Sequence, residues 1–182
     1  NMILGLPPTE AEFAYSIIKD DKDAIDLEIA AGVRFSSRSI LMPYPGTEIG
    51  KYCEEKGYFV MNVDEFGESL LEKSPLNCFS EEQHNVMKNL AYLSGLAVLW
   101  PRLAPFIKNH AVHWRGRFIK KLYLSIYYVV KVYTLKKYIY PIKIRNPWRG
   151  LKDLIKGYWI DVFRTMPEMR KTITYPAPKA KN

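Results

Sequence analysis

Two short apolar stretches near the start of the chain each end in a proline-containing turn. Residues 2–6 (MILGL) lead into Pro7-Pro8, and residues 33–42 lead into Pro43-Tyr44-Pro45-Gly46. Proline fixes φ and removes an amide donor, and glycine permits backbone conformations that are closed to other residues. The pattern predicts two β-strands, each ended by a sharp turn.

A helical pattern comes after each predicted strand. Thr9 opens a capping box, and its helix is expected to reach Gly32, with a kink or an interruption near the acidic cluster at residues 20–23. Thr47 caps a shorter helix over residues 48–56. The order strand, helix, strand, helix predicts parallel strands with crossover helices, an α/β layer. Because two such strands cannot form a stable sheet alone, we expect further strands upstream or from another chain.

Two arginines are unusual in the second predicted strand. Arg34 and Arg38 share one face of residues 33–42, because side chains alternate along a strand. If this face lines a cleft, the guanidinium groups could bind a carboxylate or a phosphate. The favoured alternative is that they lie exposed or pair with acidic residues of the preceding helix.

The second half of the chain is predicted to be helical. Residues 58–75 show no clear period and are typical of a loop around a short amphipathic element. Ser80 then caps a helix, and prolines at 101 and 105 break the chain after it. A further amphipathic helix is predicted over residues 148–165. Beyond residue 115 aromatic and basic residues alternate beside one apolar stripe at helical spacing, formed by Phe118, Leu122, Ile126 and Val129.

Composition adds a division of charge to this picture. Of the 182 residues 48% are hydrophobic, enough for a folded core, and the net charge is +8. Residues 1–101 carry 8 Lys and Arg against 16 Asp and Glu, whereas residues 102–182 carry 19 against 3. A basic half of this kind predicts a surface that meets phosphate, in a lipid headgroup or in a nucleic acid.

The remaining signals concern the setting of the protein. Cys53 and Cys78 are too few for a disulfide framework and no signal-peptide pattern opens the chain, so a cytoplasmic location is expected, peripheral to a membrane at most. No uninterrupted apolar run approaches the roughly 20 residues that span a bilayer. The chain opens inside a pattern typical of a buried strand, which predicts a piece of a longer protein.

The two strand-turn segments resemble the carboxyl-terminal part of radical S-adenosylmethionine enzymes of the cobalamin-binding-domain type. That family has a strand close to N-M-x-G-L-P-G-E-T, a later strand ending in F-Q-P-Y-P-G-T-E-L, and a helical tail with P-x-L-x-P-L-I-K. The matching segments here are residues 1–7 (NMILGLP), 40–49 (ILMPYPGTEI) and 101–108 (PRLAPFIK). The match covers residues 1 to about 110, and its P-Y-P-G-T-E block is the more specific part.

The resemblance implies an α/β fold: the last two strand-helix units of a partial (β/α)6 barrel in residues 1–75, followed by a mostly α-helical, basic extension in residues 76–182. It implies S-adenosylmethionine and a [4Fe-4S] cluster in the full-length protein and leaves open whether cobalamin is used. In the family the strand with G-L-P contacts the cofactor. The candidate cofactor-binding residues are therefore Ile3, Gly5, Pro7, Pro43, Tyr44, Pro45 and Gly46; the alternative, that they only turn the chain, stays open.

The chain departs from the family pattern in three ways. Pro8-Thr9-Glu10 replaces the family's G-E-T, so the glutamate at that site is lost or displaced, and Met42 replaces the glutamine before P-Y-P. The chain also lacks the C-x-x-x-C-x-x-C motif, whose three thiolates anchor the cluster. The piece alone is therefore not expected to be active, and no catalytic residue is assigned.

Two further features of the basic half bear on function. His110 and His113 lack a third metal ligand at suitable spacing, so no metal site is predicted. The aromatic and basic tail has three interpretations: helices packed on the barrel, a helix on an anionic membrane surface, or nucleic-acid binding, which the apolar stripes disfavour.

We therefore expect part of a radical S-adenosylmethionine enzyme, whose partner is the upstream part of the same protein. Its tail covers the barrel or docks to a membrane. The alternative is a non-enzymatic, peripheral membrane-binding or scaffold module. The residue pattern carries no code for a substrate.

Overall fold

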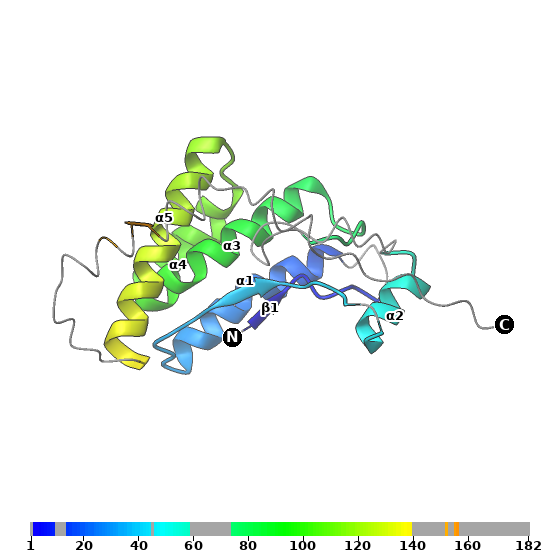
Figure 1. Ribbon diagram of the computed structural model, residues 1–182, viewed down its shortest axis with the longest axis horizontal. Helices are drawn as coiled ribbons and strands as arrows, with labels where there is room; N and C mark the ends of the chain where they lie inside the picture. Colours follow the sequence, from blue (N-terminus) through cyan, green and yellow to red (C-terminus); the bar gives the residue numbers. More distant parts are fainter. Residues whose placement is uncertain are drawn as a thin grey trace. The chain divides into compact units, whose positions relative to one another are not determined.

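The computed structural model describes residues 2–9, 14–44, 46–58 and 74–139, together with Lys152, Ile155 and Lys156. This part of the chain is mostly helical and contains one two-stranded parallel sheet (Figure 1). The fold is therefore mixed α/β, as predicted.

The sheet consists of β1 (Met2–Leu4) and β2 (Arg38–Ile40), which run parallel. Met2 lies opposite Arg38, and Leu4 lies opposite Ile40. The predicted strand over residues 33–42 is therefore too long, because among the described residues only the three residues of β1 offer it a partner. The parallel pairing is confirmed, and the described residues do not form a barrel.

The first crossover helix, α1 (Ala14–Ala30), is continuous. The expected interruption at residues 20–23 is wrong, because the helix accommodates these side chains: Lys19 forms an i,i+4 ion pair with Asp23 at 3.7 Å. Gly32 comes after the helix with φ +66°, which confirms the predicted left-handed C-cap. Glu12, the second half of the capping box predicted for Thr9, lies outside the described residues.

The next two helices begin at the predicted caps. α2 (Glu48–Glu55) starts after Thr47, whose hydroxyl accepts a hydrogen bond from the third helical amide. α3 (Glu81–Leu99) starts with a complete capping box between Ser80 and Gln83. Both helix starts depend on local side-chain chemistry, which explains why the sequence predicts them correctly.

Short helices come after α3. The long helix ends at Leu99, before Pro101, and Pro101 and Pro105 each occupy the first turn of a new helix, where a missing amide donor costs nothing. The elements are the 3₁₀ helix η3 (Pro101–Leu103), α4 (Ala104–Asn109), the 3₁₀ helix η4 (Ala111–His113), α5 (Arg117–Thr134) and the π-helix η5 (Leu135–Ile139).

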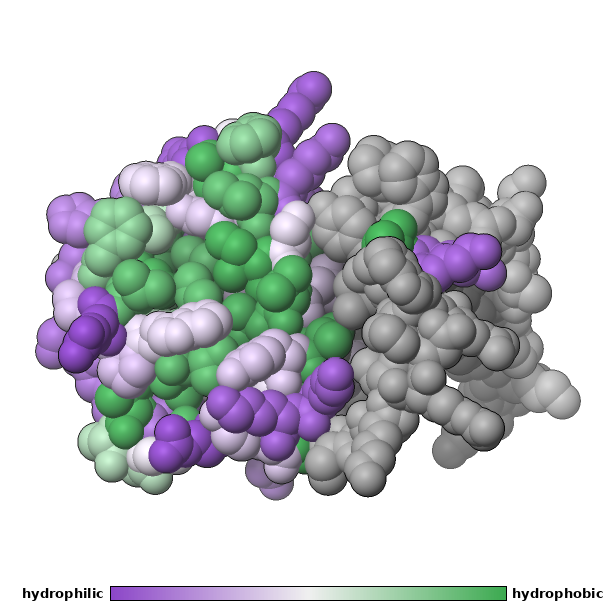
Figure 2. All heavy atoms as spheres, turned by 90° about the vertical axis from the view of Figure 1, so that its left-hand side faces the viewer, coloured by the Kyte–Doolittle hydropathy of each residue, from purple (hydrophilic) through white to green (hydrophobic). Residues whose placement is uncertain are grey.

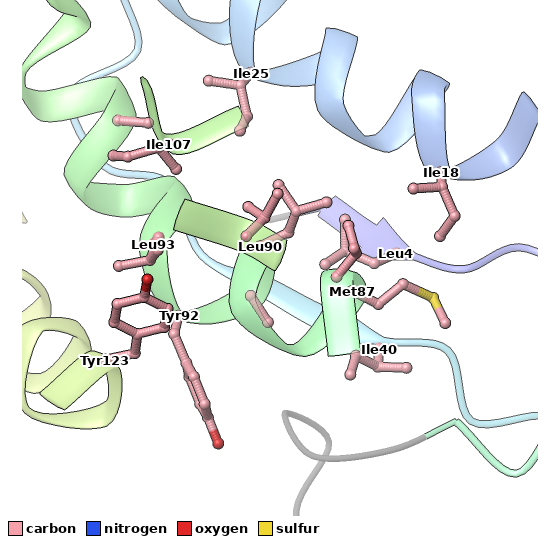
Figure 3. Close-up of a cluster of buried hydrophobic side chains, with 14 of the residues drawn as sticks. Leu4, Ile18, Ile25, Ile40, Met87, Leu90, Tyr92, Leu93, Ile107 and Tyr123 are labelled. Carbon is pink, nitrogen blue, oxygen red and sulfur yellow. The ribbon is translucent and has the colours of Figure 1, made fainter. Parts of the chain in front are cut away.

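The core lies between the sheet, α1 and α3 (Figure 3). Leu4 lies between Ile18 of α1 and Met87 of α3, and Ile40 lies on the other side of Met87. Burying such a side chain contributes about 1.5–3 kcal/mol, so this cluster stabilises the packing of the sheet against both helices. The predicted apolar face of α3 is buried, which confirms Val86, Leu90, Leu93 and Ala97 as core residues.

Two compact units divide the chain, Asn1–Ile142 and Lys143–Asn182. Within the first unit α3 packs on both α1 and β2, so the hydrophobic core continues across the expected boundary between residues 75 and 76. Most of the loop predicted over residues 58–75 and of the helix predicted over residues 148–165 lies outside the described residues.

Candidate functional site

The carboxyl ends of β1 and β2 lie side by side, so the two proline turns leave the sheet at the same edge. One backbone hydrogen bond joins the strands at this edge, from the Leu41 amide to the Leu4 carbonyl at 2.9 Å. In α/β folds this edge is where loops bind ligands. The fold thus brings together the two segments that carry the predicted site.

Two carboxylates of α1 hold the strands from the helix side of the sheet. The Gly5 amide donates to Asp21 Oδ2 at 3.0 Å. Arg38 Nη2 donates to Glu28 Oε2 at 2.7 Å, and the Ser36 hydroxyl donates to the same oxygen at 2.8 Å. The predicted pairing of Arg38 with an acidic residue of the helix is confirmed, although the pair is buried rather than exposed.

Burial governs the electrostatics of this cluster. It raises the pKa of Asp21 to about 6, against the opposing effects of the Gly5 hydrogen bond and the charge of Arg38. Burial also lowers the pKa of Arg38, although Glu28 opposes this shift. Among the described residues Nε and Nη1 of Arg38 have no hydrogen-bond partner. The cluster therefore holds the strand ends in place at a cost in desolvation free energy, because its charged groups do not face solvent.

The helix α2 ties the two turns to one another. The Tyr52 hydroxyl donates to the Pro8 carbonyl at 3.2 Å, in the segment after β1. The Thr47 hydroxyl donates to the Tyr44 carbonyl at 2.7 Å, in the segment after β2. A Cβ on Gly50 would lie 2.4 Å from the same carbonyl oxygen, so only glycine allows this close approach. One short helix thus fixes both segments.

The predicted site residues differ in their access to a ligand. Gly5 and Pro43 are buried and Pro7 is half-buried, whereas Pro45 lies outside the described residues. Ile3 is 53% exposed and Tyr44 is 55% exposed, and Gly46 also lies at the surface. Within the described structure Ile3, Tyr44 and Gly46 are therefore the predicted residues best able to contact a ligand.

Gly5 serves the fold through its own conformation. Its φ is +68°, and a Cβ there would lie 2.5 Å from Sδ of Met87 in α3. Its amide donates to Asp21. Both its missing side chain and its amide are thus explained by internal contacts, so the interpretation of Gly5 as a residue that turns the chain has direct support.

The sequence pattern missed three residues of this site: Asp21, Tyr52 and Leu6. Asp21 had a readable signal, because Ile18, Asp21, Ile25 and Glu28 succeed one another at helical spacing. Two carboxylates on an apolar stripe indicate buried partners. Leu6 is an exposed apolar residue in the turn after β1. No sequence pattern marks Tyr52, since its hydrogen bond to the segment after β1 depends on where α2 lies.

Candidate chemistry elsewhere is weak. Among the described residues no group of three or more His, Cys, Asp or Glu side chains could hold a metal ion. His113 Nδ1 lies 3.7 Å from Glu82, and the ring of His110 lies against Phe106. Burial raises the pKa of Cys53 and raises that of Cys78 to about 11, so both thiols are protonated near neutral pH.

Two findings concern the setting of the chain. In the part that the structure describes, every helix is too short or too polar to cross a bilayer. Comparison of the chain with protein-family models, with curated proteins and with solved structures gave no match in any of the three.

Proposed function

We propose that this chain is the carboxyl-terminal part of a radical S-adenosylmethionine enzyme of the cobalamin-binding-domain type. In this proposal β1 and β2 are the last two strands of a partial (β/α)6 barrel. The turns at their carboxyl ends form part of the wall of the cofactor and substrate pocket.

The observation that carries the proposal is the side-by-side position of the two strand ends. The G-L-P turn comes after β1 and the P-Y-P-G turn after β2, and the strands are parallel neighbours with one register. These are the two motifs that the family also has at strand ends. The two motifs come from separate segments of the sequence, yet they meet at one edge of the sheet. If the similarity of these short segments to the family were due to chance, their motifs would not need to meet in this way.

The exposure of the sheet also supports a larger assembly. Leu4 and Ile40 pack toward α1 and α3, but Ile3, in the middle of β1, is 53% exposed. Parallel sheets are ordinarily covered on both faces and contain more than two strands. Further strands of a barrel would complete the sheet and turn the face of Ile3 toward the barrel interior.

The two proposed cofactors fit this chain to different degrees. The chain has only two cysteines, so it cannot supply the three thiolates that hold a cluster of this class. The exposed side chains on β1 and in the turns after the two strands, Ile3, Leu6 and Tyr44, are apolar or aromatic, and such groups suit an adenine ring. When bound, S-adenosylmethionine and the cluster would supply the radical chemistry. This chain would supply only a binding wall.

The test begins with the reading frame upstream of residue 1. A C-x-x-x-C-x-x-C motif is expected there, and an upstream frame that lacks it would rule out the proposal. The longer protein, prepared without oxygen, is then titrated with S-adenosylmethionine. Tyr44→Ala is expected to weaken binding about tenfold, as loss of an aromatic contact to a base does.

Phe106→Ala is the matched control, because Phe106 is also a half-exposed aromatic residue but belongs to α4. Its affinity for S-adenosylmethionine should equal that of the unmodified protein. Equal affinities for Tyr44→Ala and Phe106→Ala would remove the turn after β2 from the cofactor pocket.

A further inference from the structure

One side of α5 is apolar and open to solvent. Phe118 is 77% exposed and Val129 is 64% exposed, and Leu122 and Tyr133 belong to the same stripe. We call these four residues the α5 stripe. They are separated by intervals of 4, 7 and 4 residues, which places them on one helix face. Figure 2, turned toward the side where α5 lies, shows hydrophobic residues gathered over a broad area with hydrophilic residues at its margin.

The opposite side of α5 already has its partner. Tyr123, Tyr127, Val130 and Thr134 are buried. The rings of Tyr127 and Tyr92 of α3 lie 6.1 Å apart, and Val130 approaches Gly95 of α3. The core of the described unit therefore does not need the α5 stripe, so the stripe is an additional apolar surface.

The charged residues of α5 and η5 are all basic. No Asp or Glu occurs in the sequence between Glu82 and Asp153. Four exposed cations lie on α5 and η5: Arg117, Lys121, Lys136 and Lys137. The Lys137 ammonium lies 5.2 Å from the ring centroid of Tyr133 and 5.1 Å from that of Tyr138. Cationic and aromatic groups thus meet at the carboxyl end of the stripe.

These observations discriminate between partners. A second copy of this helix would bring cations against cations, with no acidic residue nearby in sequence to offset them. A nucleic acid would pair with the cations but would leave Phe118, Leu122 and Val129 against water. An anionic bilayer satisfies both requirements, because acyl chains cover apolar groups while headgroups meet Lys and interfacial aromatic residues.

We propose that the α5 stripe docks to an anionic lipid bilayer, with Phe118, Leu122 and Val129 at the acyl boundary. Lys136 and Lys137 meet the headgroup phosphates, and Tyr133 lies at headgroup level. This surface is formed by α5 and η5 and not by the strand ends, so the proposal does not depend on the proposed enzyme family.

The experiment is flotation of the full chain with vesicles of phosphatidylcholine, with or without phosphatidylserine. Binding is expected with phosphatidylserine at low salt and should fall as salt rises. Lys136→Gln with Lys137→Gln is expected to weaken binding about 30-fold, the effect of removing two cations near an anionic surface. Phe118→Ser with Val129→Ser is expected to weaken it at least about tenfold.

Leu27→Ser is the control, because Leu27 is 68% exposed but lies on α1. It should bind vesicles as the unmodified chain does. Circular dichroism checks that every variant is folded, which exposed positions should permit. Failure of the unmodified chain to bind phosphatidylserine vesicles at low salt would overturn the proposal, and so would equal binding by the Phe118 and Val129 variant.

Sedimentation tests the competing partner. A concentration-dependent dimer that Phe118→Ser with Val129→Ser dissociates would assign the stripe to a second copy of the chain and would also overturn the proposal. The expected result is that Phe118→Ser with Val129→Ser leaves the state of association unchanged, including any association through the open edges of the two-stranded sheet.

Discussion

The amide of Gly5 donates a hydrogen bond to the carboxylate of Asp21 at 3.0 Å, which joins the end of β1 to the middle of α1. The bond lies where Gly5 turns the chain with φ +68°. Asp21 is buried, and burial raises its pKa to about 6. The geometry of the candidate site therefore rests on a carboxyl group that titrates just below neutral pH.

This titration gives the stability of the chain a predictable pH dependence. The folded state binds a proton at Asp21 with a pKa of about 6, whereas an unfolded aspartate binds one only near its ordinary pKa of 3.8. The contribution of protonated Asp21 to the free energy of unfolding is complete below pH 3.8, the ordinary pKa of the unfolded aspartate. It is lost as the pH rises through about 6. Urea unfolding at a series of pH values should show this trend. The same series on Asp21→Asn, subtracted from that of the unmodified chain, isolates the contribution of Asp21 to the pH dependence.

The hydrogen bond and the charge of Asp21 can be separated by substitution. Asp21→Asn retains an acceptor for the Gly5 amide and removes the buried charge, so stability at neutral pH should be kept or increased. Asp21→Ala leaves the amide without this acceptor and should cost about 1–3 kcal/mol. Urea unfolding measures both. A loss for Asp21→Asn as large as for Asp21→Ala would contradict the assignment of Asp21 as a hydrogen-bond acceptor.

The buried pair of Arg38 and Glu28 should be costly to break and inexpensive to replace as a whole. Arg38→Met leaves Glu28 buried without a cation, and we expect a loss of about 3–5 kcal/mol. Combining it with Glu28→Gln should recover most of this loss. Arg34→Met is the control, because Arg34 is exposed and such changes shift stability by about 0.5 kcal/mol or less. Equal losses for the two arginine variants would contradict a buried ion pair.

Alanine substitutions at Gly5 and Gly46 separate the cost of backbone strain from the cost of a steric clash. Both have positive φ, +68° and +81°, so alanine is strained at either position. A Cβ on Gly5 would lie 2.5 Å from Sδ of Met87, whereas one on Gly46 would meet nothing within 4 Å. Gly5→Ala should therefore cost about 1–3 kcal/mol more than Gly46→Ala in thermal or urea unfolding. Met87→Ala in the Gly5→Ala background should reduce the difference if the clash causes it.

Local chemistry made much of the chain predictable from its sequence. Thr47 and Ser80 cap helices because their hydroxyl groups accept amides within the same turn, and Gly32 ends α1 because it tolerates positive φ. The proline turns likewise act on their immediate neighbours. The pattern strand, helix, strand, helix and the mixed α/β class were predictable from these signals.

Contacts between distant segments were decided only by the tertiary structure. The length of β2 depends on the three residues of β1 that pair with it, and the role of Tyr52 depends on where α2 lies. A helical pattern could place Phe118 and Val129 on one face, but it could not show whether another element covers that face. In the described structure α3 takes the opposite side of α5, because that side carries the tyrosines that fit against it. The sequence determined where most elements start and stop, and the packing determined which faces were left for a partner.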